Sequence, residues 1–166
     1  ADLVIGAPVA SPAGGWSGAS YVVYGKTDTD PVALSAVQSA GNTGGFIIEG
    51  KTAKSYFGQS VSGAGDVNAD GYDDLIIGAY QADPNDPNSG ESYVIYGRPD
   101  VGGNKIGTAI DLVQIAGDTG GFVISGEGEN DHSGYSVSDA GDVNGDGFGD
   151  IIVGAPNADP NGAASG

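Results

Sequence analysis

Two nine-residue segments of the chain carry oxygen-bearing side chains at alternate positions. In both, Asp or Asn occupies positions one, three, five and nine, and the backbone carbonyl of residue seven adds a further oxygen. A tight loop with this spacing can direct several hard oxygen ligands at one cation, and neither segment has the His or Cys that zinc prefers. We therefore expect calcium (Ca2+) to bind both loops. The expected ligands are Asp66, Asn68, Asp70, Tyr72 and Asp74, and Asp142, Asn144, Asp146, Phe148 and Asp150.

Each loop has a glycine at its sixth position and runs into an apolar segment. Gly71 and Gly147 permit the positive φ that a chain reversal demands at this point. Residues 75–77 and 151–153, which follow the ninth position, are Leu, Ile or Val, and such a run is typical of a buried strand. Both loops are therefore expected to lead directly into strands of a sheet.

Two other interpretations compete with a cation site of this kind. The helix-flanked EF-hand begins with the same Asp-x-Asn-x-Asp-Gly pattern, but it needs a bidentate Glu at position twelve. That position is Ile77 in one loop and Val153 in the other, which excludes the EF-hand. Ordinary turns are also rich in Asp, Asn and Gly. Two loops of identical spacing, each closed by Asp, favour the cation site over plain turns.

The composition favours short strands and tight turns, and it argues against anionic partners. Of 166 residues 32 are glycine, and 22 acidic residues against 5 basic ones give a formal net charge of −17. Such a field repels nucleic acid and anionic membrane surfaces. No apolar run approaches the length of a membrane span. We expect neither nucleic-acid binding nor membrane insertion.

The cellular compartment is predicted from the calcium loops, because the chain has no cysteine from which a disulfide framework could be inferred. A cage built from one loop of oxygens suits calcium-rich extracellular fluid better than the cytosol, where free calcium is scarce. An extracellular or cell-surface location is therefore expected. The chain starts at Ala1 without an initiator Met, so a processed product or an excerpt of a longer chain is expected.

The sequence repeats itself with a unit of about 75 residues, and this period decides the fold. Four short strands are predicted in each unit: one before the oxygen loop (58–62 or 134–138), one after it, a Tyr-Val-Ile-Tyr segment, and a fourth (46–49 or 122–125). Residues 109–113, between the third and fourth, are long enough for one helical turn at most. Four strands per unit describe a propeller blade. The predicted fold class is all-β, with blades of four antiparallel strands.

These motifs resemble the FG-GAP repeat. The resemblance rests on the oxygen loop, on the strand that follows it and ends in Gly-Ala-Pro, and on Phe57-Gly58 before one loop, and it covers essentially the whole chain. It implies the seven-bladed β-propeller of integrin α chains, and the sequence is also similar to secreted bacterial proteins of integrin α-like type. Ser133-Gly134 departs from Phe-Gly and Ala79-Tyr80 from Ala-Pro, but both departures fall at turns, away from the expected ligands.

The predicted blades do not close a ring. The repeat divides the chain into a partial blade over 1–50, a full blade over 51–126 and a partial blade over 127–166. Open strand edges are templates for pairing with further strands. Two explanations stay open, namely a longer parent chain that supplies those strands, or self-association through the blade edges, which gives a filament when the contact does not close.

The expected function is that of an extracellular calcium-binding β-propeller module for cell adhesion or for structural and surface assembly. The alternative is a self-assembling filament or surface-layer subunit joined by edge-strand pairing. A further alternative is a non-catalytic part of a secreted hydrolase, because the resemblance extends to a secreted phospholipase in which the repeats accompany a separate catalytic domain. The chain has one His and no Gly-x-Ser-x-Gly nucleophile elbow, so no enzyme activity is expected.

Two single residues lie outside these motifs. His132 stands among the polar residues of 129–133, where a solvated turn residue is expected rather than a catalytic one. Trp16 lies in the glycine-rich loop 14–18. An exposed aromatic side chain there can anchor a partner, or it can pack against the neighbouring blade, which is the expected arrangement. The sequence names no adhesion ligand.

Overall fold

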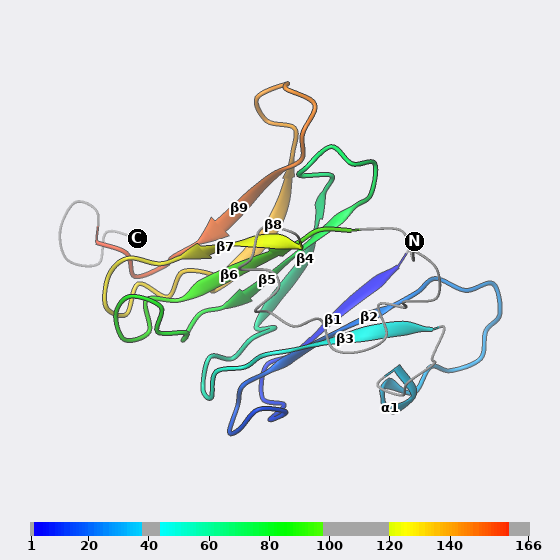
Figure 1. Cartoon of the computed structure of the whole chain (residues 1–166), viewed down its shortest axis with the longest axis horizontal. Helices are drawn as coiled ribbons and strands as arrows, with labels where there is room; N and C mark the ends of the chain where they lie inside the picture. The colour runs from blue at the N-terminus through cyan, green and yellow to red at the C-terminus, as the bar shows by residue number, and fades with distance from the viewer. Residues whose placement is uncertain (1, 38–43, 98–119, 160–166) are drawn as a thin grey trace.

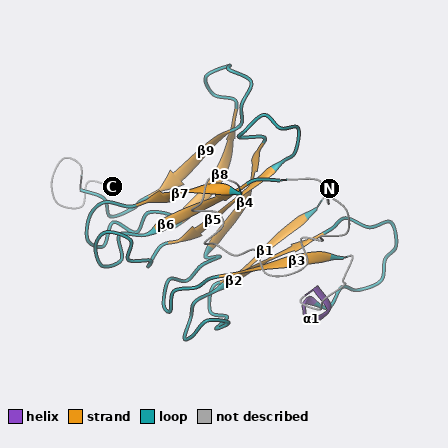
Figure 2. Ribbon diagram, in the orientation of Figure 1, coloured by secondary structure: helices purple, strands orange, loops and turns teal. Residues whose placement is uncertain are grey.

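The computed structural model describes residues 2–37, 44–97 and 120–159. Strands and turns make up almost all of this part, with one helical turn, α1, as the exception (Figures 1 and 2). The described elements are β1 (Leu3–Ala7), β2 (Ala19–Val23), α1 (Leu34–Val37), β3 (Gly45–Glu49), β4 (Ser60–Gly65), β5 (Asp74–Ala79), β6 (Glu91–Ile95), β7 (Gly121–Ser125), β8 (Ser136–Gly141) and β9 (Asp150–Gly154).

The described strands form three antiparallel sheets with the orders β1-β2-β3, β4-β5-β6-β7 and β8-β9. Their registers repeat, because Ile5 pairs with Tyr21 in the first sheet as Ile77 pairs with Tyr93 in the second. The predicted all-β fold with four-stranded antiparallel blades is therefore confirmed, and the three sheets do not close into a ring. The blade boundaries at residues 50 and 126 stay predictions.

The strand before each oxygen loop lies later in the chain than predicted. The structure places β4 at Ser60–Gly65 and β8 at Ser136–Gly141 rather than at 58–62 and 134–138. The physical reason is the positive φ at Gly58 and Gly134, which makes these residues part of a turn. The segment 109–113 lies outside the described residues, and α1 is its counterpart in the first unit.

Successive side chains of β5 point to opposite faces of the central sheet and pack into two different hydrophobic cores. Ile77 packs with Phe46 and Ile48 of the first sheet, whereas Ile76 packs with Val137 of the third. Both isoleucines are completely buried. Complete burial of such a side chain contributes about 1.5–3 kcal/mol to stability. Because its side chains alternate between the two faces, β5 packs against both neighbouring sheets and links all three.

Neighbouring sheets meet through pairs of glycines. A Cβ atom at Gly6 would lie 2.0 Å from the carbonyl oxygen of Gly58, and one at Gly78 would lie 2.0 Å from the carbonyl oxygen of Gly134. Gly6 lies in β1 and faces Gly58, which precedes β4. Gly78 lies in β5 and faces Gly134, which precedes β8. The backbones therefore touch at these points, and no side chain fits between them.

The glycine contact predicts a large difference between two Gly-to-Ala substitutions. Gly78→Ala drives a methyl group into the backbone of Gly134, whereas Gly63→Ala places its methyl group in open space at an ordinary φ. We expect Gly78→Ala to lower the free energy of unfolding by about 1–3 kcal/mol or more, and Gly63→Ala to leave it nearly unchanged. Urea unfolding followed by circular dichroism measures both. Equal midpoints for the two variants would contradict the backbone contact.

Candidate metal centre

The two oxygen loops project from the same end of their sheets, one between β4 and β5 and the other between β8 and β9 (Figure 1). At position six, Gly71 has a φ of 88° and Gly147 a φ of 90°. The positive φ expected at this position is therefore confirmed in both loops. Position four is also left-handed, at Ala69 in the first loop and Gly145 in the second. The two loops thus share one backbone conformation.

The carboxylate at position one closes each loop on itself. In the first loop, the Asp66 carboxylate accepts hydrogen bonds from the amides of Asp70 (3.0 Å) and Gly71 (2.8 Å). In the second, Asp142 accepts from the amides at the same two positions, at 3.1 and 2.9 Å. These bonds turn the chain back toward its start, so the alternate side chains belong to one compact turn.

Positions three and five repeat this pattern. The side-chain oxygen of Asn68 accepts from the Asp70 amide at 2.9 Å, and the Asp70 carboxylate accepts from the Tyr72 amide at 2.9 Å. The second loop has the same two bonds at 2.8 and 3.0 Å. The side chains of Tyr72 and Phe148 are 43% exposed, so burial does not account for these residues at position seven. Their expected contribution remains the backbone carbonyl.

Position nine ties the first loop to the sheet, which the sequence analysis missed. Asp74 is completely buried, and its carboxylate accepts from the amide of Val67 in the loop (2.8 Å) and from the amide of Gly97 beyond β6 (2.7 Å). Burial raises the pKa of the Asp74 carboxyl, while the backbone hydrogen bonds from Gly97 and Val67 act to lower it.

One of these two bonds recurs in each of the other two units. Asp150 accepts from the Val143 amide at 2.8 Å, and Asp2, which has no described loop before it, accepts from the Gly25 amide at 2.8 Å. In the sequence repeat Asp2 occupies the same position as Asp74, and this match was the available signal for the structural role. An Asp at this position supports the sheet in its own right.

The loops fit a hard cation by the chemistry of their donors. All the expected side-chain ligand atoms are oxygens, and a carboxylate oxygen that accepts one hydrogen bond from an amide keeps a second lone pair for a metal ion. The carboxylates are nevertheless directed at loop amides, and among the described residues no group of three or more His, Cys, Asp or Glu side chains is assembled closely enough to hold a metal ion. The structure therefore brings the predicted residues into two turns and does not gather them into cages.

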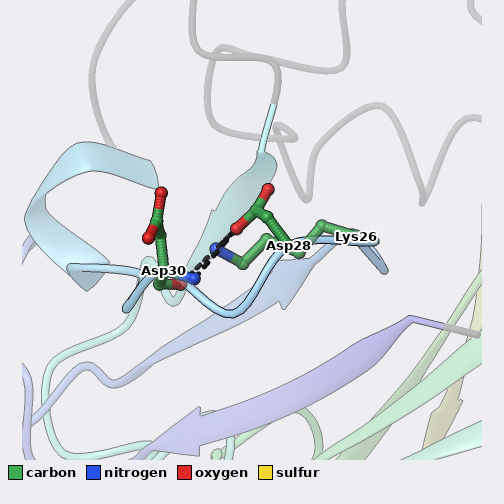
Figure 3. Close-up of polar contacts among 3 residues, drawn as sticks. All are labelled: Lys26, Asp28 and Asp30. Atoms are coloured by element: carbon green, nitrogen blue, oxygen red, sulfur yellow. Dashed lines mark hydrogen bonds and ion pairs between the residues drawn. The ribbon is translucent and has the colours of Figure 1, made fainter.

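Lys26 and two acidic residues stabilise the turn after β2 by contacts within the turn, and we do not assign a binding site to them. The ammonium nitrogen of Lys26 lies 2.6 Å from a carboxylate oxygen of Asp28 and also donates to the backbone carbonyl of Asp30 (Figure 3). The hydrogen bond from Lys26 holds the pKa of the Asp28 carboxyl below its usual range. Both charges are engaged within a single exposed turn, where ion pairs contribute little.

An aromatic row crosses the three sheets at the end of the strands opposite the oxygen loops. Tyr80, directly after β5, lies between Tyr56 (ring centroids 5.6 Å apart) and Tyr135 (5.3 Å), and Trp16 lies 5.8 Å beyond Tyr56. Trp16 packs on the neighbouring blade and still exposes 50% of its surface. His132 also contacts Tyr80, at 5.4 Å. We define the row as Trp16, Tyr56, Tyr80 and Tyr135.

His132 is more engaged than a solvated turn residue. Its ring is half-buried against Tyr80, and its Nδ1 atom lies 2.8 Å from the side-chain nitrogen of Asn157. The backbone of His132 is left-handed, with a φ of 57°. These contacts give the residue a structural place between the second and third sheets.

A family model described as FG-GAP repeat matches the chain over residues 57–95 and 133–166, and both oxygen loops lie within these matches. The chain is 37% identical to integrin alpha-PS2 of Drosophila melanogaster over 118 residues, which is 70% of this chain and 8% of that protein. It is 33% identical to integrin alpha-3 of Cricetulus griseus over 66% of the chain and 9% of the relative, and 35% identical to integrin alpha-5 of Xenopus laevis over 67% and 10%. The chain thus spans a tenth or less of the length of these relatives.

The shared backbone of the loops predicts opposite effects for two exchanges at position four. Ala69 carries a Cβ atom at a left-handed φ of 57°, whereas Gly145 has none at 78°. We expect Ala69→Gly to raise the free energy of unfolding, and Gly145→Ala to lower it, by about 1 kcal/mol each. Chemical denaturation in the presence of a chelator measures these changes without bound metal. Effects of the same sign would contradict a common loop conformation.

Proposed function

The chain is an FG-GAP repeat protein similar to integrin alpha chains, and from this premise we propose that it is an extracellular, calcium-binding β-propeller module. It serves in cell adhesion or in structural and surface assembly. The observation that supports this best is the pair of oxygen loops, which repeat the same turn and the same hydrogen bonds from backbone amides to the side-chain oxygens at positions one, three and five.

The role of calcium in this proposal is structural. The first loop carries four aspartates and the second carries three, and a bound divalent cation supplies the positive charge that offsets their mutual repulsion. Asp66, Asn68 and Asp70 hold the cation in the first loop, together with the carbonyl of Tyr72. Asp74 contributes there only with the lone pairs that the Val67 and Gly97 amides leave free. The residues of the second loop act in the same way.

We propose that the module binds partners and does not catalyse a reaction. The histidine of the chain is held against Tyr80 and Asn157, and no helix in the described residues has the length and hydrophobicity needed to cross a membrane. The extracellular location rests on the supply of free calcium there. The aromatic row is the proposed contact surface for a protein partner, since its ends, Trp16 and Tyr135, are about half exposed and aromatic residues are enriched at interface hot spots.

Self-association through blade edges is a second candidate function. Among the described strands β1 pairs only with β2, and β9 pairs only with β8. Leu3 on β1 and Ile152 on β9 are exposed by 58% and 60%. Unpaired edges with exposed apolar side chains favour pairing with further strands, either from another part of a longer chain or from a second copy.

Calcium binding predicts different effects for two aspartate variants, one on the number of calcium ions bound and the other on stability without metal. Asp70→Ala should reduce the calcium bound per chain from two ions to one and should have little effect on stability in chelator. Asp74→Ala should destabilise the protein by about 2 kcal/mol or more even in chelator, because it leaves two partly buried amides without their acceptor. Asp86→Ala, in an exposed turn, is the matched control for loss of a carboxylate.

Isothermal titration calorimetry and thermal melting with and without chelator measure these effects. Occupancy at a hundredfold excess over the dissociation constant contributes about 2.7 kcal/mol per site, so chelator should lower the melting midpoint of the wild type clearly. Absence of binding heat, or an unchanged stoichiometry in Asp70→Ala, would refute the calcium sites.

Edge pairing predicts that association depends on Ile152. A lysine at this position adds a charge to the exposed edge of β9, which natural sheets use to prevent pairing. We expect the wild type to form larger species with rising concentration in sedimentation velocity, and Ile152→Lys to remain monomeric. A wild type that stays a stable monomer at all concentrations would argue against self-association.

A further inference from the structure

The two oxygen loops contact each other through their backbones. The amide of Gly149, at position eight of the second loop, donates to the backbone carbonyl of Asp66 at position one of the first, at 2.8 Å. Figure 1 shows the two loops at the same end of neighbouring sheets, although they are far apart in the sequence. The first ligand position of one site is therefore hydrogen-bonded to the other site.

This contact leaves no room for a side chain at position eight of the second loop. A Cβ atom on Gly149 would lie 2.7 Å from the carbonyl oxygen of Ala64 and 3.1 Å from the amide nitrogen of Asp66. The same position of the first loop is Asp73. Glycine thus stands where the second loop fits against the first.

The strands beneath the loops continue the contact. The amide of Val137 in β8 donates to the hydroxyl of Ser60 in β4 at 3.0 Å, and the amide of Asp139 donates to the hydroxyl of Ser62 at 3.4 Å. The seam between the two sheets therefore runs from their first strands into the loops.

Asp66 joins the two sites because both ends of the residue are engaged. Its carboxylate closes the first loop, and its carbonyl fixes Gly149 of the second. Gly149 directly precedes Asp150, the ninth position of the second loop. A ligand that orders Asp66 therefore also orders this part of the second loop, and the conformational entropy lost there is not lost again on the second binding event.

We infer that the two loops take up divalent cations as a positively coupled pair, with Gly149 as the positioning residue that joins them; this inference rests on the proposed calcium binding. Repulsion between the two cations opposes the coupling. This repulsion is limited because the four aspartates of the first loop and the three of the second outweigh one divalent charge in each, and because salt at about 0.15 M screens exposed charges beyond about 8 Å.

Calcium titration of single-loop variants by calorimetry, in about 0.15 M salt, tests the coupling. Asp146→Ala leaves only the first loop able to bind, and Asp70→Ala leaves only the second. We expect the second binding step of the wild type to be at least fivefold tighter than binding to either variant, and the coupling factor to be the same for both loops, as linkage requires. Gly149→Ala should remove the coupling while both loops still bind, and Gly63→Ala, whose methyl group meets nothing, should keep it.

Hydrogen exchange of the Gly149 amide gives a second readout that does not need the Gly149→Ala variant to fold. In Asp146→Ala, calcium can bind only the first loop, and we expect exchange at Gly149 to slow at least fivefold when it does. Two independent binding steps in the wild type, with unchanged exchange at Gly149, would overturn the coupling alone. No calcium binding by the wild type would overturn both the coupling and the proposed function.

Discussion

The buried carboxylate of Asp74 is the interaction on which both the oxygen loop and the central sheet depend. It accepts one hydrogen bond from the amide of Val67 in the loop and one from the amide of Gly97, just beyond β6. Asp2 makes the second of these bonds with Gly25 in the first unit. Because the charge is buried, removal of either amide leaves it under-satisfied, so loop and sheet keep one relative position. The position of the loop is thereby set by the strand order of the blade.

Close backbone contact between neighbouring blades extends this order across the molecule. Gly78 against Gly134, and Gly149 against Asp66, allow successive sheets to approach more closely than side chains would permit. The strands then run in a common direction from one blade to the next, with the oxygen loops at one end and the aromatic row at the other. A seam of this kind separates the end that carries the oxygen loops from the end that carries exposed aromatic rings.

The features that depend on local spacing were predictable from the sequence. The apolar run 75–77 predicted β5, and glycine at position six predicted the left-handed turn. What was missed depends on residues far apart in the chain, such as the bond from Gly97 to Asp74 and the contact between Gly149 and Asp66. Spacing also predicted that the loop oxygens converge on one point. In the structure the loop carboxylates accept hydrogen bonds from backbone amides of the same loop, because these amides lie beside them.

A crystal structure determined in the presence of calcium tests the central claim most directly. We expect one ion in each loop, surrounded by six to eight oxygens at about 2.3–2.6 Å, with side-chain ligands from positions one, three, five and nine and the carbonyl of position seven. Loops that hold only water, with their carboxylates bonded to the same amides as in the structure described above, would contradict it.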